Sequence, residues 1–486
     1  MIADARFRAL SARLAQLWLA GERHAALAQL HLSLYEDSVR AAVATYGALN
    51  AYAVWDQAAA YREQLDWWNA ADWLRGLKAL PQAVLVAVDV HCSQIDPDLD
   101  SRGEEIIFAE AVYVRGYSSH EVTTDIGTDH GILVRVNVLK NPTRGFGTFQ
   151  SSSRHYYMRH HWCFTEERGG IVRRVSPLRS QTAIDSLEAL LQSGQPLSVA
   201  LVELPKVVHK ALLAPQLGVS NLWASGGLDN WEAIARAIKM AIADARQTGK
   251  HILLLPELGG SPEIWAAMRE ELARNPREEN PIFVIGPTRH ETDVHGKTRN
   301  VCRVLDALGN EVEEFRHAKV NAVSLSKQLG EFALDEAIVG GNQFSLVITP
   351  IGLLAVVICH DLSQALESST LISTLADLPL YCLFVPSMSE KTTAHVHAAR
   401  NVTLENGANV LLANQALVQF FDGDNHQAWN EGGSFWYRGH PGNRPPAIEV
   451  TRYRFKEVAG EFVLDPTRVD YDPRPNETPA AMPTKY

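Results

Sequence analysis

Three residues whose side chains could together hydrolyse a carbonyl compound lie beside apolar stretches of the chain. Glu257 follows "ILLLP", Lys319 lies in "FRHAKVNAV", and Cys359 follows "GLLAVVI". A thiolate is a nucleophile, a carboxylate moves protons, and a cation stabilises a negative oxygen. Each residue also has a structural explanation of its own, as a loop acid, a solvated lysine or a buried thiol. Together they indicate one catalytic site, because open α/β sheets carry their chemistry at the carboxyl ends of strands.

This set predicts that the Cys359 sulfur attacks a carbonyl carbon and forms a thioester. Glu257 would take the thiol proton, donate it to the departing amine and then activate water. Lys319 and the backbone N–H of His360 would stabilise the negative oxygen of each tetrahedral intermediate, by roughly 3–4 kcal/mol per donor. The chemistry requires no metal and no organic cofactor.

Activation of Cys359 by a histidine is the main chemical alternative. Neighbouring side chains on an extended strand point to opposite faces, so His360 is expected not to be the base. His395 and His397 are further candidates, although nothing in their local sequence supports them. We therefore favour Glu257 as the base.

A histidine cluster earlier in the chain suggests a metal site. It comprises His155, His160, His161 and Cys163. The cluster lacks the paired spacing of a closed zinc site, and the adjacent histidines would face opposite sides of a strand. We expect no metal there.

Strands and helices must position these residues, and the pattern of the chain changes along its length. Residues 1–80 have apolar residues at helical spacing, and residues 81–194 predict an α+β region of unknown role. Over residues 195–460, apolar strands alternate with amphipathic helices, which is typical of an α/β domain. Within it, "FSLVITPIGLLAVVICHD" predicts a hairpin that turns at "TPIG". Residues 461–486 are proline-rich and predict an extended tail.

Roughly residues 196–455 resemble the nitrilase-like carbon–nitrogen hydrolase superfamily in five motifs that occur in the same order. "LLLPELGG" resembles its glutamate motif, "EFRHAKVNAV" its lysine motif, and "GLLAVVICHDL" its cysteine motif, which includes Asp361. Two later stretches, "ARNVTLENGANVLLANQA" and "GGSFWYRGHPGN", resemble its Arg…Glu-Asn helix and its Gly-x-Ser strand. The matching positions there are Arg400, Glu405, Asn406, Asn414 and Ser434.

The resemblance implies a fold and a set of catalytic roles. The fold is a four-layer α-β-β-α sandwich hydrolase domain of the α/β class, here preceded by an α+β N-terminal domain. The roles are those of a Glu–Lys–Cys triad formed by Glu257, Lys319 and Cys359. Glu257 and Lys319 are 62 residues apart and Lys319 and Cys359 are 40 apart, and these spacings fit the family.

The resemblance also implies a second acid that supports the triad, and here the sequence leaves a choice. Glu331, Asp335 and Glu336 are the candidates, of which we favour Glu336. Two other positions depart from the family pattern. His360 stands where many members have an aromatic residue, and no tryptophan precedes the Arg…Glu-Asn helix.

The composition excludes several classes of protein. Among 486 residues the net charge is −11, which argues against a nucleic-acid partner because phosphate binding needs clustered positive charge. The five cysteines form no CxxC pair, and this favours a reducing, cytoplasmic location. No stretch approaches the roughly 18 consecutive apolar residues of a membrane span, so we expect no membrane partner.

The sequence therefore favours a cysteine-dependent carbon–nitrogen hydrolase of the amidase type, acting on a small amide-like molecule. Nitrile hydrolysis and acyl transfer to an amine stay open. The alternative is a regulatory protein that uses the hydrolase fold as a sensor or scaffold for a partner held by residues 1–190. The apolar stripe over residues 366–378 would suit a homo-oligomer interface or a helix packed on its own sheet.

Overall fold

The computed structural model divides the chain into two units, Met1–Arg168 with Asp377–Pro379, and Gly169–Ala376 with Leu380–Tyr486. The residues that it describes are 124–126, 129–135, 161–165, 167–168, 171–213, 222–276, 280–325, 334–363, 375, 380–389, 391–406, 408–415, 417–419, 427–428, 433–438 and 447–469. In the first unit, an antiparallel sheet has the order β1-β2-β3. The first unit's strands are β1 (Thr124–Ile126), β2 (Asp129–Arg135), β3 (His161–Thr165) and β4 (Glu167–Arg168).

Two expectations therefore lie outside what the structure describes. The helical segment over residues 1–80 is one of them. The other is the histidine cluster, since His155 and His160 are not described, nor are the side chains of His161 and Cys163.

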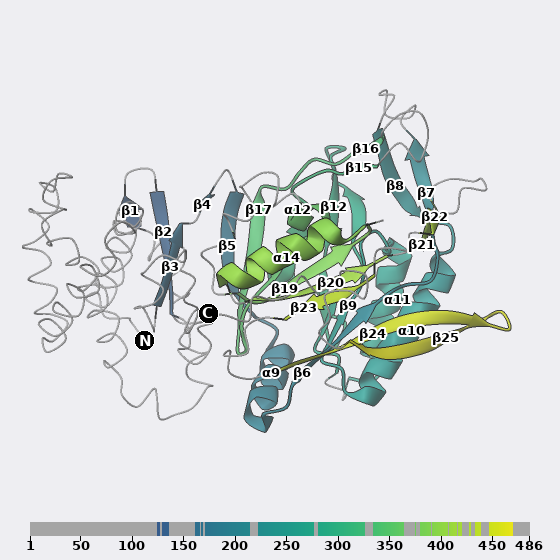
Figure 1. Cartoon of the computed structure of the whole chain (residues 1–486), viewed down its shortest axis with the longest axis horizontal. Coiled ribbons are helices and arrows are strands. Elements are labelled where there is room, and N and C mark those ends of the chain that lie inside the picture. Colours follow the sequence, from purple (N-terminus) through teal and green to yellow (C-terminus); the bar gives the residue numbers. More distant parts are fainter. Residues whose placement is uncertain are drawn as a thin grey trace, which may run out of the picture. The chain divides into compact units, whose positions relative to one another are not determined.

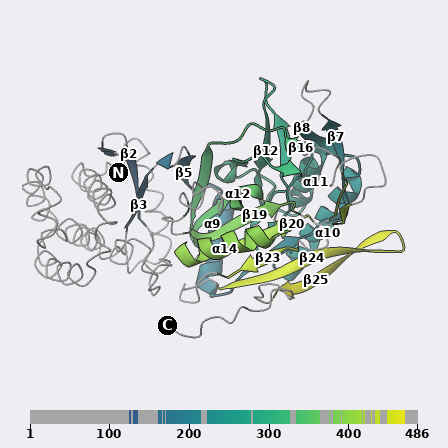
Figure 2. The same cartoon turned by 45° about the horizontal axis from the view of Figure 1, so that its top comes forward.

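The second unit is mixed α/β, and one of its sheets has the order β13-β10-β9-β6-β24-β25. Its four inner strands run parallel, and the two edge strands run antiparallel to their neighbours. Every residue of β6 and β9 is buried, as expected for parallel strands covered on both faces. Figure 2 shows β24 and β25 as a long hairpin at one edge. The strands are β6 (Leu197–Val202), β9 (Ile252–Leu254), β10 (Phe283–Ile285), β13 (Val304–Asp306), β24 (Ile448–Val458) and β25 (Glu461–Val469).

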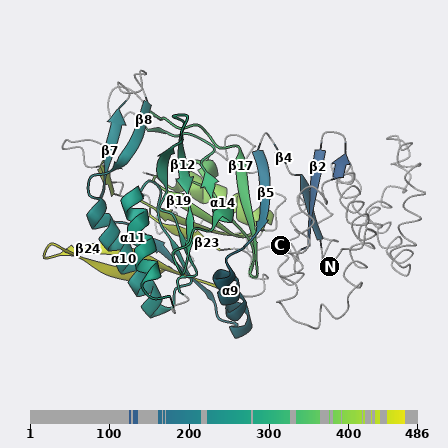
Figure 3. The ribbon, with the colours of Figure 1, turned by 180° about the vertical axis from the view of Figure 1, so that it is seen from behind.

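Helices α10 (Trp231–Thr248) and α11 (Pro262–Ala273) pack against each other and share an apolar core with this sheet (Figure 3). Their ends follow the local sequence. The Ser261 hydroxyl accepts the Ile264 N–H and Pro262 occupies the first turn, so α11 begins there. Gly249 adopts a left-handed conformation with φ +67° and ends α10.

A second sheet of this unit runs in the order β23-β20-β19-β18-β17-β5. Its strands are β5 (Ile171–Pro177), β17 (Gln343–Thr349), β18 (Gly352–Val356), β19 (Leu380–Ser387), β20 (Asn409–Asn414) and β23 (Phe435–Tyr437). Strands β18, β19 and β20 are parallel, and β17 and β18 form the hairpin that the sequence predicts. The turn is closed where the Thr349 hydroxyl donates to the Gly352 carbonyl, over 2.7 Å.

The two sheets contact each other, since β6 packs beside β20 and β9 beside β19. Helix α14 (Thr393–Asn406) lies on β20 and β23, and the short α12 (His360–Ser363) packs beside α14 (Figure 1). Helices therefore pack on each of the two sheets. The carboxyl ends of β9, β18 and β19 meet where the sheets join. Backbone hydrogen bonds cross this junction, as from Glu257 N–H to the Ser387 carbonyl over 3.2 Å.

Two further sheets and two further helical elements complete the described part of this unit. One sheet is ordered β15-β16-β8-β7-β21-β22 and the other β11-β12-β14. The strands are β7 (Val207–Leu213), β8 (Leu222–Leu228), β11 (Arg289–Thr292), β12 (Thr298–Cys302), β14 (His317–Ala318), β15 (Ser324–Leu325), β16 (Leu334–Glu336), β21 (Leu417–Gln419) and β22 (Gln427–Ala428). The helical elements are α9 (Gln181–Ser193) and the 3₁₀ turn η5 (Glu313–Phe315). No helix among the residues described here is long and apolar enough to cross a membrane.

The observed limits of this unit differ from the predicted ones at both ends. The predicted boundary at residues 194/195 separates β5 and α9 from the hydrolase domain, whereas the unit starts at Gly169 because β5 pairs in parallel with β17. The predicted tail starts at residue 461, whereas Glu461–Val469 forms β25 and pairs along its length with β24. The stripe over residues 366–378 lies outside the described residues, apart from Leu375.

Candidate active site

Cys359 lies in a sharp turn between β18 and α12, and its side chain is buried. Its φ is +42°, in the left-handed region that a residue with a Cβ rarely adopts, at a cost of about 1–3 kcal/mol. Backbone hydrogen bonds hold it there: Cys359 N–H donates to the Pro386 carbonyl over 2.9 Å, and the Cys359 carbonyl accepts the Leu362 N–H over 2.9 Å. The fold thus maintains a strained conformation at the proposed nucleophile.

The Cys359 sulfur is surrounded by polar groups from the end of β19, the loop after it and the start of α14. The Ser387 hydroxyl donates to Sγ over 3.3 Å, and the Ser389 hydroxyl lies 3.2 Å from it. His395 Nε2, on the first turn of α14, lies 3.7 Å from Sγ. These groups can each stabilise a negative sulfur.

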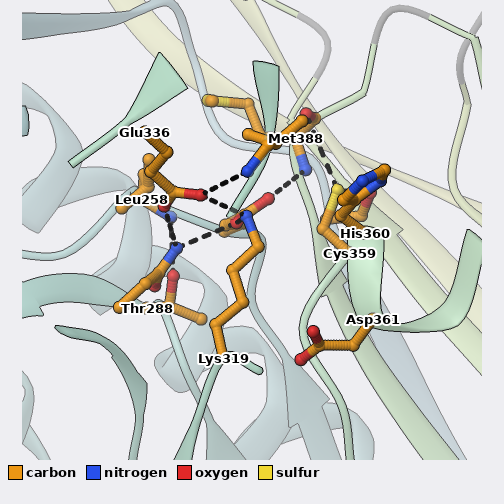
Figure 4. A network of polar contacts seen from close by, with 12 residues as sticks. Leu258, Thr288, Lys319, Glu336, Cys359, His360, Asp361 and Met388 are labelled. Carbon is orange, nitrogen blue, oxygen red and sulfur yellow. Dashed lines mark hydrogen bonds and ion pairs between the residues drawn. The ribbon is translucent and has the colours of Figure 1, made fainter. Parts of the chain in front are cut away.

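Lys319 stands at the centre of a buried network of charged and amide groups. Its Nζ lies 2.8 Å from Glu257 Oε1 and 2.8 Å from Glu336 Oε2 (Figure 4). Asn300 Nδ2 donates to both acids, over 2.9 Å to Glu257 and 3.0 Å to Glu336. Because both partners of this nitrogen are carboxyl groups, the orientation of the Asn300 amide is fixed.

Glu257 reaches this network from a tight turn after β9. Leu258, with φ +52°, donates its N–H to the Thr288 hydroxyl over 3.0 Å. The second carboxyl oxygen of Glu257 accepts the backbone N–H of Met388 over 3.1 Å, and the Met388 carbonyl lies 3.9 Å from the Cys359 sulfur. One residue therefore connects the acid with the thiol (Figure 4).

The two acids have opposite pKa shifts although they share one lysine. Burial, and next the charge of Cys359, raise the pKa of Glu257 well above its ordinary value, against the pull of Lys319. Burial also acts to raise the pKa of Glu336, but Lys319 and His290 outweigh it and hold that pKa below its ordinary value. The pKa of Lys319 is raised by the two acids despite burial. Lys319 and Glu336 thus form a stable ion pair, and Glu257 is the acid that retains a proton.

His290 on β11 forms a hydrogen bond with Glu336, and its other ring contact identifies which ring nitrogen carries the proton. Its Nδ1 accepts the backbone N–H of Ser225 over 2.9 Å, so the ring proton is on Nε2. That nitrogen donates to Glu336 Oε1 over 2.9 Å. The Val323 N–H also donates to Glu336, over 3.2 Å, and these donors favour the ionised acid.

Asp361 joins the cysteine turn to the lysine segment. Its carboxylate accepts the backbone N–H of Val320 over 3.1 Å and that of Asn321 over 2.8 Å, and His317 Nε2 lies 3.3 Å away. Gly341 secures the same segment from the other side, because its N–H donates to the Lys319 carbonyl over 2.8 Å. A Cβ at Gly341 would lie 2.5 Å from the Ala318 carbonyl oxygen, so only glycine permits this approach.

The structure brings together the predicted Glu257, Lys319 and Cys359, with Glu336 as their second acid. Of the other acid candidates, Asp335 is exposed and Glu331 lies outside the described residues. No group of three or more His, Cys, Asp or Glu side chains in the described ranges is arranged to hold a metal ion.

One expectation about the histidines is wrong, and the structure adds an observation on another. His360 does not continue a strand but begins α12, where its Nδ1 lies 3.1 Å from the Ser363 hydroxyl. His395 was a candidate partner of Cys359 without support from its local sequence, and its Nε2 lies 3.7 Å from the sulfur. His397 is exposed on the same helix.

The other motif positions have mixed outcomes. Asn414 accepts the Ser389 N–H over 2.8 Å and so positions a residue that touches the sulfur, while the Ser434 hydroxyl accepts the Asn414 N–H over 3.0 Å. Arg400 is exposed, and the side chains of Glu405 and Asn406 are not described. The sequence reasoning missed Asn300, His290, Ser387 and Ser389. Ser387 does follow a continuous apolar run, "LYCLFVP", as Glu257 and Cys359 do, whereas Asn300, His290 and Ser389 follow none.

Comparison with known proteins gives limited matches. No family model matches the chain, and no curated protein matches its sequence. An amidase from Nesterenkonia sp. is 14% identical, with 56% of this chain and 89% of that chain covered and a TM-score of 0.35. A double mutant of the amidase from Nesterenkonia sp. AN1, in complex with acrylamide, is 14% identical, with 50% and 86% covered and a TM-score of 0.35. The C. elegans NitFhit protein is 17% identical, with 49% and 56% covered and a TM-score of 0.33. Likeness at this level supports no inference about activity.

Proposed function

We propose that the chain is a cysteine-dependent hydrolase of non-peptide carbon–nitrogen bonds, of the amidase type, in a four-layer α-β-β-α sandwich. The observation that supports it best is the buried Glu257–Lys319–Glu336 network beside a strained, buried Cys359. Desolvating three ionisable groups together is costly unless they are well paired. A site that combines this network with a nucleophile suits catalysis better than stability.

In the proposed reaction, Cys359 forms a thioester with the acyl part of the substrate. Glu257, which retains a proton, would donate it to the departing nitrogen and later accept a proton from the attacking water. Lys319, kept cationic by two acids, would stabilise the negative oxygen of each tetrahedral intermediate. An amide, a nitrile and transfer of the acyl group to an amine are all compatible with these roles, and we propose the amide as the main substrate class.

The test is intact-protein mass spectrometry after incubation with a panel of primary amides, carbamoyl compounds and nitriles. The expected result is an acyl adduct on the wild-type chain that Cys359→Ala lacks, with adduct accumulating in Glu257→Gln because water activation is lost. Cys382→Ala is the matched control, since Cys382 is buried in β19 and burial raises the pKa of its thiol. It should retain the adduct.

The opposite result would favour the regulatory alternative. Absence of an adduct and of ammonia release across the panel, in a chain whose Cys359 also reacts slowly with iodoacetamide, would contradict the hydrolase proposal. Full turnover by Cys359→Ala would contradict the mechanism.

A further inference from the structure

The Cys359 thiol has a hydrogen-bond partner that can accept its proton, and that partner is not Glu257. His395 Nε2 lies 3.7 Å from Sγ, and both residues are buried, with 4% and 3% of their surfaces exposed. A distance of this size suits an S–H···N hydrogen bond, because sulfur is larger than oxygen. Within the described part of the chain, no hydrogen bond joins Glu257 to Cys359.

The oxygens of Glu257 are directed to other groups. Oε1 accepts from Lys319 and Asn300, and Oε2 accepts the Met388 N–H. Burial, and next the charge of Cys359, raise the pKa of Glu257, so a protonated Glu257 is favoured beside a negative sulfur and can serve as an acid toward the leaving nitrogen.

We propose that His395 is a catalytic residue that takes the thiol proton of Cys359, leaving Glu257 to serve the amine and the water. Its place in turnover rests on the proposed function, but the thiol–imidazole pair itself does not. The contacts at the sulfur favour this division, because the Ser387 hydroxyl donates to Sγ and can stabilise the thiolate that forms.

The proton steps balance as follows. The S–H proton passes to His395 Nε2, and the sulfur lone pair forms a C–S bond as the carbonyl π pair moves to oxygen. The oxyanion collapses, the C–N bond breaks, and nitrogen takes the Glu257 proton. Water then attacks the thioester and gives a proton to Glu257. The C–S bond breaks, and the departing sulfur recovers its proton from His395.

Several titratable groups lie near the pair. Three of them form the buried network: Glu257 from the turn after β9, Lys319 from the segment after β14, and Glu336 from β16. The charges of Lys319 and Glu336 cancel each other. His360 lies on α12 beside α14, and its ring contacts Ser363. His397 and Lys391 are exposed. Among these groups, His395 is the one whose titratable nitrogen contacts the sulfur.

The test measures alkylation of Cys359 by iodoacetamide, resolved by peptide mass spectrometry, and needs no substrate. An ordinary thiol is almost fully protonated at about pH 6, so a proton acceptor should accelerate alkylation there by roughly tenfold after allowing for the lower nucleophilicity of a stabilised thiolate. His395→Gln keeps a polar nitrogen near the Nε2 position but cannot take the proton. It should react about tenfold more slowly than the wild type at pH 6 and equally fast at about pH 9.5.

Two further variants make the result specific. His397→Gln changes an exposed histidine on the same helix and should react like the wild type. Glu257→Gln should also keep the wild-type rate at pH 6, while losing turnover. The proposal is overturned if His395→Gln matches the wild type at pH 6, if it is slower by the same factor at both pH values, or if Glu257→Gln shows the loss instead.

A measurement on the wild type covers the case in which His395→Gln does not fold. At about pH 6 the wild type should have more ultraviolet thiolate absorbance than Cys359→Ala, because the imidazole holds the proton. Equal absorbance would overturn the proposal. Alkylation that depends on His395 in a chain that hydrolyses no amide would refute the proposed function and leave the thiol–imidazole pair standing.

Discussion

Replacement of Lys319 by methionine tests the charge balance of the site most directly. Lys319 is fully buried and its Nζ lies 2.8 Å from both Glu257 and Glu336. Methionine has a similar length and no charge, so the variant leaves two facing carboxyl groups without a cation. Removing one partner of a buried ion pair costs about 3–5 kcal/mol. We expect Lys319→Met to lower the free energy of unfolding by about that amount at neutral pH and to abolish activity.

The pH dependence of this loss identifies its cause. Glu336 keeps its charge in the wild type because Lys319 and His290 hold its pKa below the ordinary value of 4.5. Without Lys319, the folded variant must keep an extra proton on the acid pair, which an unfolded chain releases above pH 4.5. The folded variant therefore binds one more proton on the acid pair than the folded wild type, in which Glu257 is the protonated acid, and its stability relative to the wild type falls as pH rises. The difference from the wild type should grow by about 1.4 kcal/mol per pH unit.

The assay is urea unfolding of both proteins at several pH values between about 5.5 and 7.5. Lys297→Met, at an exposed lysine, is the control and should show no such slope. Lys319→Met combined with Glu336→Gln removes one cation and one acid and should lose most of the slope. A stability difference that stays constant with pH would refute the assigned charge states.

Two predictions concern the backbone around the nucleophile. Asp361→Asn keeps an acceptor oxygen for the N–H groups of Val320 and Asn321 but removes the negative charge that strengthens these hydrogen bonds, so the free energy of unfolding should fall by about 1–3 kcal/mol. Asp185→Asn on the exposed face of α9 is the control and should change nothing. In urea unfolding, Cys359→Gly should have a free energy of unfolding about 1–2 kcal/mol higher than that of Cys359→Ala, because glycine adopts a φ of +42° without strain. Greater stability of the alanine variant would contradict the left-handed conformation at this position.

Much of the second unit could be predicted from local patterns. The continuous apolar runs give β6 and β9, and the turn at Thr349–Gly352 gives the β17–β18 hairpin. The secondary structure before Lys319 was harder to predict, because the pattern of "EVEEFRHAKV" indicates one continuous strand. It forms the 3₁₀ turn η5 and the two-residue β14, since only His317 and Ala318 pair with β12.

The site could be predicted only where a side chain follows an apolar run. Glu257 and Cys359 have that signal, and Lys319 has a weaker one. Asn300 and His290 come from neighbouring strands whose sequences show nothing unusual, and His395 comes from a helix that begins after β19. Their proximity to the triad depends on how the sheets and helices pack, which no local spacing encodes. The position of His360 was wrong because the strand was assumed to continue past Val356.

The site is assembled at a junction between two sheets, with Glu257 contributed from the β9 side and Cys359 from the β18 side. Backbone bonds such as Glu257 N–H to Ser387 hold the junction closed. The chemistry therefore depends on the alignment of two layers more than on either layer alone. A shift of one sheet relative to the other by a fraction of a residue would separate Glu257 from Cys359 while leaving the helices and strands intact, so the proposed activity would report on the alignment of the two sheets.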